Sequence, residues 1–123
     1  MSETERQQAS EVAVVRVEQA GPVGRNPVPW SRVPGFAVRV RYFLADGTVR
    51  ENSSMASRKK DLLAELARLP GRPRQPLFAR FNDAGELVGY IEEYAAHPER
   101  YEAGRRWLAA CETFESARAK DIA

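Results

Sequence analysis

The sequence FAVRVRYFLADGTVRE spans residues 36–51 and contains the pattern that decides the fold. Its first nine residues alternate as they do in a strand, so that one face carries Phe36, Val38, Val40 and Tyr42 and the other carries Ala37, Arg39, Arg41 and Phe43. Asp46-Gly47 is a strong turn signal, because glycine adopts the left-handed conformations that a tight hairpin requires. The stretch therefore predicts an antiparallel hairpin whose second strand covers Thr48 to Glu51.

Further strand segments lie on both sides of this hairpin in the sequence. β-Branched residues are frequent from Glu11 to Val17, which predicts a strand. Leu77 to Phe81 and Leu87 to Tyr94 are separated by Asn-Asp-Ala-Gly, residues 82–85. This turn sequence between two apolar runs predicts a second hairpin.

Two helices are expected. Ser57 suits the N-cap of a helix over residues 58–69, because its hydroxyl can accept a hydrogen bond from a free backbone N–H. Leu62 and Leu66 then lie on one apolar stripe of that helix, together with Leu69. Pro98 suits the first turn of a C-terminal helix. The apolar residues of this second helix form two adjacent stripes, namely Tyr101, Gly104, Leu108 and Cys111, and Trp107, Ala110, Phe114 and Ala117.

These segments predict an α+β fold. We expect an antiparallel sheet of about five strands in the order β-β-β-α-β-β-α, with two helices packed on one face. Residues 1–10 are expected to be a flexible polar tail, and 11–123 a single domain with a proline-rich loop at 20–35, which holds four prolines. The residues expected to be buried together are Val38, Val40, Tyr42, Leu62, Leu66, Phe81, Ile91, Leu108 and Phe114.

Composition indicates the compartment. A single cysteine excludes an internal disulfide, and the N-terminal sequence MSETERQQAS lacks the basic start and the apolar stretch of a signal peptide. No apolar run approaches the roughly 18 residues that span a membrane. We therefore expect a cytoplasmic protein with no membrane partner. Three lysines beside sixteen arginines indicate a GC-rich genome, bacterial or phage.

The chain offers few groups suited to catalysis. The only histidine, His97, precedes a helix start, where a cap or surface role is expected, and no base is placed beside a nucleophile. The only cysteine, Cys111, falls on an apolar stripe and is expected in the core. One histidine and one cysteine do not make a zinc site. We expect no catalytic residue, no metal and no cofactor, so that the protein is not an enzyme.

The formal net charge of +2 hides an uneven distribution. Residues 16–80 hold 13 basic and 5 acidic side chains, whereas residues 81–123 hold 5 basic and 9 acidic ones. Such a molecule has one pole that attracts anionic partners. The residues that we expect to bind a nucleic acid are Trp30, Arg39, Arg41, Arg58, Lys59, Lys60, Arg72, Arg74 and Arg80. If they act together, they should lie near one surface, and removal of Arg39 and Arg41 should flatten the salt dependence of binding.

The stretch from Trp30 to Leu66 is similar in pattern to the arm-type DNA-binding domains of tyrosine integrases. It contains an aromatic residue, arginine-bearing strands, a Asp-Gly turn and a basic helix start in the same order. The resemblance implies DNA binding through the sheet. A second hairpin and a second helix follow in this chain where an integrase continues to its catalytic domains, so we do not assign the chain to that family.

Two functions therefore stay open. The first is a small non-catalytic nucleic-acid-associated accessory factor that uses the basic surface of residues 16–80. The alternative is a protein-interaction or regulatory module, such as an inhibitor or adaptor, that binds a partner protein through the proline-rich loop or a sheet edge.

Overall fold

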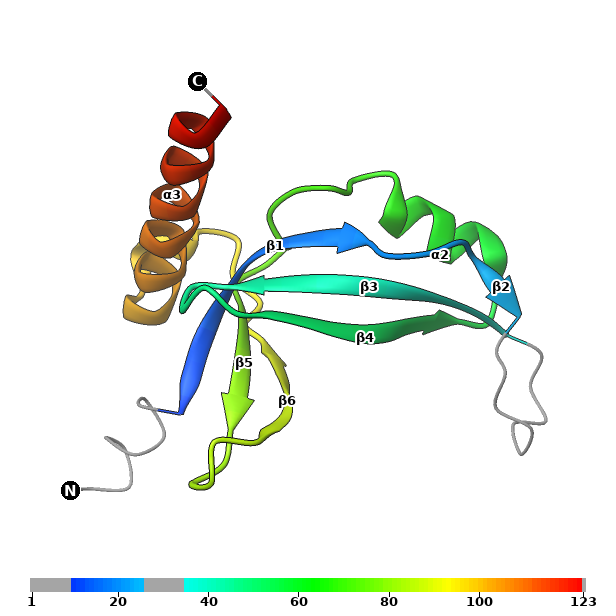
Figure 1. Ribbon diagram of the computed structural model, residues 1–123, viewed down its shortest axis with the longest axis horizontal. Coiled ribbons are helices and arrows are strands. Elements are labelled where there is room, and N and C mark those ends of the chain that lie inside the picture. Colours follow the sequence, from blue (N-terminus) through cyan, green and yellow to red (C-terminus); the bar gives the residue numbers. More distant parts are fainter. Residues whose placement is uncertain (1–9, 26–34, 123) are drawn as a thin grey trace.

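The computed structural model describes residues 10–25 and 35–122 of the chain. The elements in chain order are β1 (Glu11–Gln19), β2 (Gly24–Arg25), β3 (Phe36–Leu44), β4 (Val49–Ala56), α2 (Lys59–Leu66), β5 (Leu77–Phe81), β6 (Leu87–Glu92), the 3-10 turn η1 (Pro98–Arg100) and α3 (Glu102–Ile122). The predicted α+β class is confirmed, because these residues form a curled antiparallel sheet with two α-helices (Figure 1). Of the predicted tail, only Ser10 falls within the described residues.

β1 joins the two hairpins into one sheet. Its first residues, Glu11 to Ala13, pair with β5, and its later residues, Val14 to Gln19, pair with β3. The register with β3 shifts between Val14 and Arg16, and Figure 1 shows β1 changing direction along its length. A bulge of this kind bends a strand. The hairpins β3–β4 and β5–β6 therefore extend in different directions from one shared strand.

The β3–β4 hairpin is longer than the sequence predicts. All eight residues of β4 are in register with β3, from Val49 opposite Phe43 to Ala56 opposite Phe36. The sequence predicts a return strand only as far as Glu51. The next three residues, Asn52 to Ser54, are polar and do not alternate with apolar residues as the residues of a strand usually do. They form a strand because β3 offers a continuous partner. The two-residue strand β2 also pairs with β3, so part of the predicted 20–35 loop is a strand.

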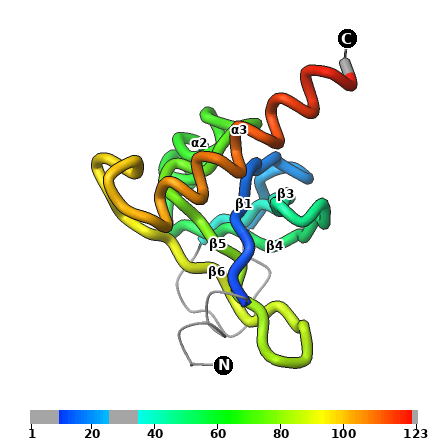
Figure 2. The backbone as a smooth tube through the Cα atoms, turned by 90° about the vertical axis from the view of Figure 1, so that its left-hand side faces the viewer, coloured from blue at the N-terminus to red at the C-terminus, as the bar shows by residue number. Residues whose placement is uncertain are grey.

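The two helices do not share a face, which corrects the predicted packing. Leu62 and Leu66 of α2 pack with Val14, Val38 and Val40 in one core cluster. On the other side of the sheet, α3 forms a second cluster, whose buried members are Ala13, Val15, Phe78, Trp107 and Cys111. Figure 1 shows α3 at one end of the molecule, away from α2, and Figure 2 shows α3 running across the strands. The helices separate because β1 carries apolar side chains on both of its faces.

The single predicted core is therefore two cores. Val38, Val40, Leu62 and Leu66 are buried beside α2, with Tyr42 and Phe81 partly buried against them. Leu108 and Phe114 lie partly buried in the α3 cluster, and Ile91 belongs to neither cluster. The best-buried side chains of α3 are Trp107 and Cys111. The indole Nε1–H of Trp107 donates to the carbonyl oxygen of Val14 at 2.8 Å, which ties α3 directly to the backbone of β1.

The start of each helix also differs from the prediction. Ser57 does not cap α2, since Arg58 occupies the N-cap position and makes no capping hydrogen bond with its side chain. Pro98 begins η1 and not α3, and the extended residue Tyr101 separates the two. Gly104 lies so close to η1 that a Cβ at this position would meet the Pro98 carbonyl oxygen well inside van der Waals contact.

Replacement of Gly104 by alanine should destabilise the protein. Alanine favours a helix by about 1 kcal/mol over glycine, but its Cβ would force η1 away from α3 and cost about 1–3 kcal/mol. We expect a net loss in the free energy of unfolding, measured by urea denaturation. Gly21→Ala is the control, because no atom lies within 4 Å of its Cβ position. Equal or greater stability of Gly104→Ala would show that η1 does not pack as described.

Candidate functional site

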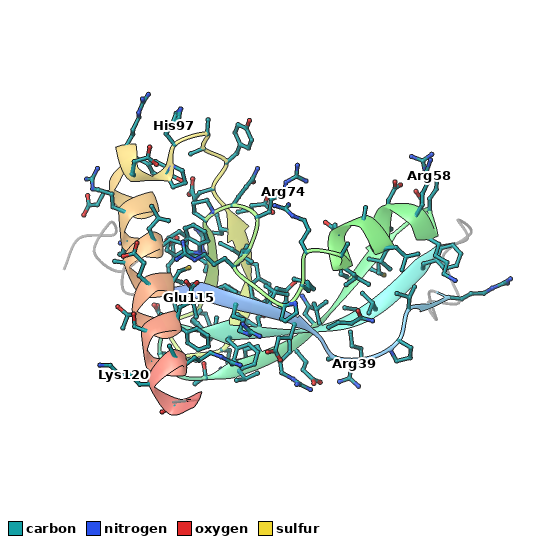
Figure 3. All side chains as sticks on the ribbon, turned by 90° about the horizontal axis from the view of Figure 1, so that it is seen from above. Arg39, Arg58, Arg74, His97, Glu115 and Lys120 are labelled. Carbon is teal, nitrogen blue, oxygen red and sulfur yellow. The ribbon has the colours of Figure 1, made fainter. Side chains whose placement is uncertain are left out.

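The structure divides the predicted basic residues between two sides of the sheet. Val38 and Val40 face α2, so Arg39 and Arg41 project from the opposite face of β3. Figure 3 shows Arg39 pointing away from the side on which Arg58 and Arg74 lie. The single surface expected from the sequence is therefore not formed. Trp30 lies outside the described residues.

The basic side chains of β3 and β5 are paired with glutamates. Arg39 and Arg41 both contact the carboxylate of Glu51 on β4, at 2.6 Å and 3.3 Å. Arg80 contacts Glu11, its partner across β1 and β5, at 3.1 Å. Each of these cations already has an anionic neighbour, which weakens the potential that it presents to a phosphate.

A different set of cations remains free. Lys59, Lys60, Arg68 and Arg74 are exposed, and none of them forms an ion pair within residues 10–25 and 35–122. They belong to α2 and to the segment that connects α2 with β5. We call this region the α2–connector surface and define it by its six cations, Arg58, Lys59, Lys60, Arg68, Arg72 and Arg74. Arg68 was missed in the sequence analysis.

The α2–connector surface borders a hollow with a volume of about 350 Å³. Its floor is mostly apolar and is formed by Val17, Val40, Tyr42, Leu66, Leu69 and Leu77. Its rim is exposed and charged, and the rim side chains are Asp61, Glu65, Arg68, Arg72, Arg74 and Glu92. An apolar floor with a few polar groups around it is the usual construction of a ligand site.

Two of the rim charges are held by neighbours. Asp61 contacts Arg58 at 3.1 Å, and Arg72 donates twice to the Glu115 carboxylate on α3, at 2.5 Å and 2.8 Å. The other four rim charges have no ion pair in the part of the chain that the structure describes, and they are Glu65, Arg68, Arg74 and Glu92. The hollow thus presents two cations and two carboxylates to a ligand.

Tyr42 supplies an aromatic ring to the floor. Its ring lies 4.5 Å from that of Tyr90, centroid to centroid, at an interplanar angle of 38°. Burial raises the pKa of the Tyr42 hydroxyl, and the nearby Glu65 carboxylate raises it further. The hydroxyl therefore stays protonated at neutral pH and is available as a hydrogen-bond donor.

The groups considered for catalysis lie apart from this hollow. His97 is exposed, and its Nδ1 lies 3.4 Å from the carboxylate of Glu99. Cys111 is buried in the α3 core, as predicted, and burial raises the pKa of its thiol to about 12. A protonated thiol is a poor nucleophile. Among the described residues, no cluster of three or more His, Cys, Asp or Glu side chains could hold a metal ion.

Comparison with known proteins gives no relative. No protein-family model matches the chain, and no significant similarity to a curated protein or to a solved structure was found. Neither α2 nor α3, the helices of the described residues, combines the length and the apolar character that crossing a membrane requires. The α2–connector surface and its hollow are therefore the candidate functional site.

The ion pair of Arg72 and Glu115 makes a pH-dependent contribution to stability. The hydrogen bonds from Arg72 hold the pKa of Glu115 below its ordinary value of 4.5. A carboxyl whose pKa is lowered by folding stabilises the protein fully above its unfolded pKa, and this contribution is lost as the pH falls through the folded pKa. Glu115→Gln should therefore lower the free energy of unfolding at pH 7, by about 1 kcal/mol or less for so exposed a pair.

The same variant should match the original protein at a pH below the folded pKa of Glu115, where the carboxyl is protonated in both states. Urea denaturation at neutral and at acid pH measures this difference. Glu86→Gln is the control, because Glu86 lies in the exposed β5–β6 turn and its side chain forms no ion pair with a described residue. A pH-independent effect of Glu115→Gln would contradict the assignment.

Proposed function

We propose that this protein is a non-catalytic nucleic-acid-binding module that contacts the sugar-phosphate backbone through the α2–connector surface. The proposal includes a cytoplasmic location, in which the single cysteine is reduced. The observation that carries it is the set of four exposed cations without an ion pair, Lys59, Lys60, Arg68 and Arg74. A phosphate backbone gains affinity from several unpaired cations on one side of a protein, because each cation can neutralise a phosphate.

The local structure supports this use of the cations. Lys59 and Lys60 lie in the first turn of α2, where positive charge opposes the helix dipole and lowers helix stability. Asp61 offsets only part of that charge, because it is already paired with Arg58. An arrangement that costs stability is consistent with a role in binding an anion.

The non-catalytic part of the proposal rests on the state of the reactive groups. The Cys111 thiol is buried and protonated, and the exposed His97 has a glutamate as its charged neighbour. Neither group lines the hollow. Acid–base catalysis requires a general base within reach of the reacting group. Around the hollow, the carboxylates that could take this role are Asp61, Glu65 and Glu92, and the lining includes neither a histidine nor a cysteine.

A protein partner is the second candidate, and the free edge of β4 favours it. Within the described residues, β4 pairs with β3 and with no other strand. An open edge of eight residues can add a strand from another protein. One of its donors is already used, however, since the backbone N–H of Ser53 donates to Asn52 Oδ1 at 2.9 Å. Such a local bond blunts the edge, and for this reason we rank the nucleic-acid proposal first.

Binding to a nucleic acid should weaken steeply with salt, and the slope should depend on Arg68 and Arg74. Each phosphate contact on a single strand contributes about −0.7 to the log–log slope of affinity against salt. The double variant Arg68→Ala/Arg74→Ala should therefore flatten the slope by about 1.4. Fluorescence anisotropy with a labelled random-sequence oligonucleotide, between about 50 mM and about 200 mM salt, measures it.

The matched control is Arg39→Ala/Arg41→Ala, which removes the same two charges from the other side of the sheet. It should leave the slope nearly unchanged, which reverses the expectation drawn from the sequence. If the control flattens the slope as much as the test variant does, binding depends on net charge and not on the α2–connector surface. If the unmodified protein shows no salt-sensitive binding, the nucleic-acid proposal is wrong and the β4 edge becomes the first candidate.

A further inference from the structure

Two of the cations that we propose to contact phosphate line the hollow. Arg68, two residues after the end of α2, and Arg74 in the connector both belong to its rim, so a backbone held by these two side chains runs along the edge of the hollow. The volume of about 350 Å³ falls within the roughly 300–1,000 Å³ of small-molecule sites. A group that enters the hollow from such a backbone has to be covalently attached to that backbone. In a nucleic acid the group that fits this description is a base.

The floor of the hollow suits a flat apolar surface. Val40, Leu66 and Leu69 line it together with Tyr42, whose ring also contacts the ring of Tyr90. Bases that leave a stack are usually received by aromatic and apolar side chains. A base inside a duplex is paired and stacked, and it cannot reach the floor without first leaving the helix.

The rim favours bases with an amino group. Glu65 and Glu92 line the hollow without an ion pair to another described residue, and an ionised carboxylate only accepts hydrogen bonds. Adenine, cytosine and guanine carry an exocyclic amino group that donates to such an acceptor, whereas thymine and uracil carry none and present carbonyl oxygens instead. A carboxylate next to such a carbonyl would place two hydrogen-bond acceptors together, which disfavours thymine and uracil.

We propose that the hollow accepts one unstacked base that carries an exocyclic amino group, with the adjoining phosphates on Arg68 and Arg74, so that the module binds single strands in preference to duplex. This inference rests on the proposed function. It adds a substrate class, single-stranded nucleic acid, and a base preference. It also assigns a role to Glu65 and Glu92, which a surface built only for phosphate would not need.

The test fills the hollow without changing any charge. Ala64 is an exposed residue of α2 that lines the hollow, so Ala64→Phe places a ring in its mouth. Ala109→Phe is the matched control, since Ala109 is an exposed residue of α3 and does not line the hollow. Circular dichroism melting confirms that both variants fold. Anisotropy then gives the affinity of each for labelled oligo-dC, oligo-dA, oligo-dT and a hairpin duplex at one low salt concentration.

We expect the unmodified protein and Ala109→Phe to bind oligo-dC or oligo-dA more tightly than oligo-dT and the duplex. Ala64→Phe should weaken binding to the preferred strand by about fivefold or more, as the loss of one base contact does, and should leave duplex binding unchanged. Glu65→Gln should narrow the difference between oligo-dC and oligo-dT, because an amide donates as well as accepts.

The possible failures are distinguishable. Salt-sensitive binding without a preference for single strands, or a preference that Ala64→Phe leaves intact, overturns the base-binding inference while the phosphate-binding proposal stands. Binding of oligo-dT as tight as that of both oligo-dC and oligo-dA overturns the role of the carboxylates. No binding of the unmodified protein to any of the four probes overturns both proposals, and an apolar side chain of a protein partner then becomes the candidate occupant of the hollow.

Discussion

Both hairpins pair with β1, and its side chains belong to the core clusters of both helices, so this strand limits where the other elements can lie. Its first residues pair with β5 and its later residues pair with β3, with the register shift between Val14 and Arg16 separating the two sets. Val14 and Val17 face α2, whereas Ala13 and Val15 face α3. A strand that is covered on both faces must be apolar on both. The hydrogen bond from Trp107 to the Val14 carbonyl then fixes α3 to the strand at the bend.

The distribution of charge follows from that arrangement. Once Val38 and Val40 pack against α2, strand alternation sends Arg39 and Arg41 to the other face, where Glu51 on the neighbouring strand pairs with both. Cations from α2 and its connector then stay on the α2 side of the sheet. The charge asymmetry of the sequence is therefore divided in space into a compensated group on the strands and a free group on α2 and the connector.

Local patterns in the sequence predicted the elements well, and the arrangement of those elements less well. The alternation in FAVRVRYFL, the Asp46-Gly47 turn and the Leu62 and Leu66 stripe each depend on neighbours in the chain, and each is found in the structure. The prediction of both helices on one face fails at the apolar run from Val12 to Val15, because a continuous run is also typical of a strand buried on both faces. The extension of β4 beyond Glu51 depends on its pairing with β3, and the polar residues of β4 do not by themselves predict that pairing. The hollow combines residues from β1, β3, α2 and the connector, and no local pattern predicts such a combination.

The connector is fixed at two neighbouring residues, and this bears on the binding that we propose. Val17 and Gly71 exchange backbone hydrogen bonds, with N–O distances of 2.9 Å and 3.2 Å, so the connector is held to β1. The next residue, Arg72, is held to α3 by Glu115. The Arg72 guanidinium therefore serves to hold the connector to α3. Arg74, two residues later, has no ion pair among the described residues. Ordering a flexible loop opposes binding because conformational entropy is lost. A connector whose backbone is already fixed avoids most of that loss, and in the phosphate binding that we propose only the Arg74 side chain has to be ordered.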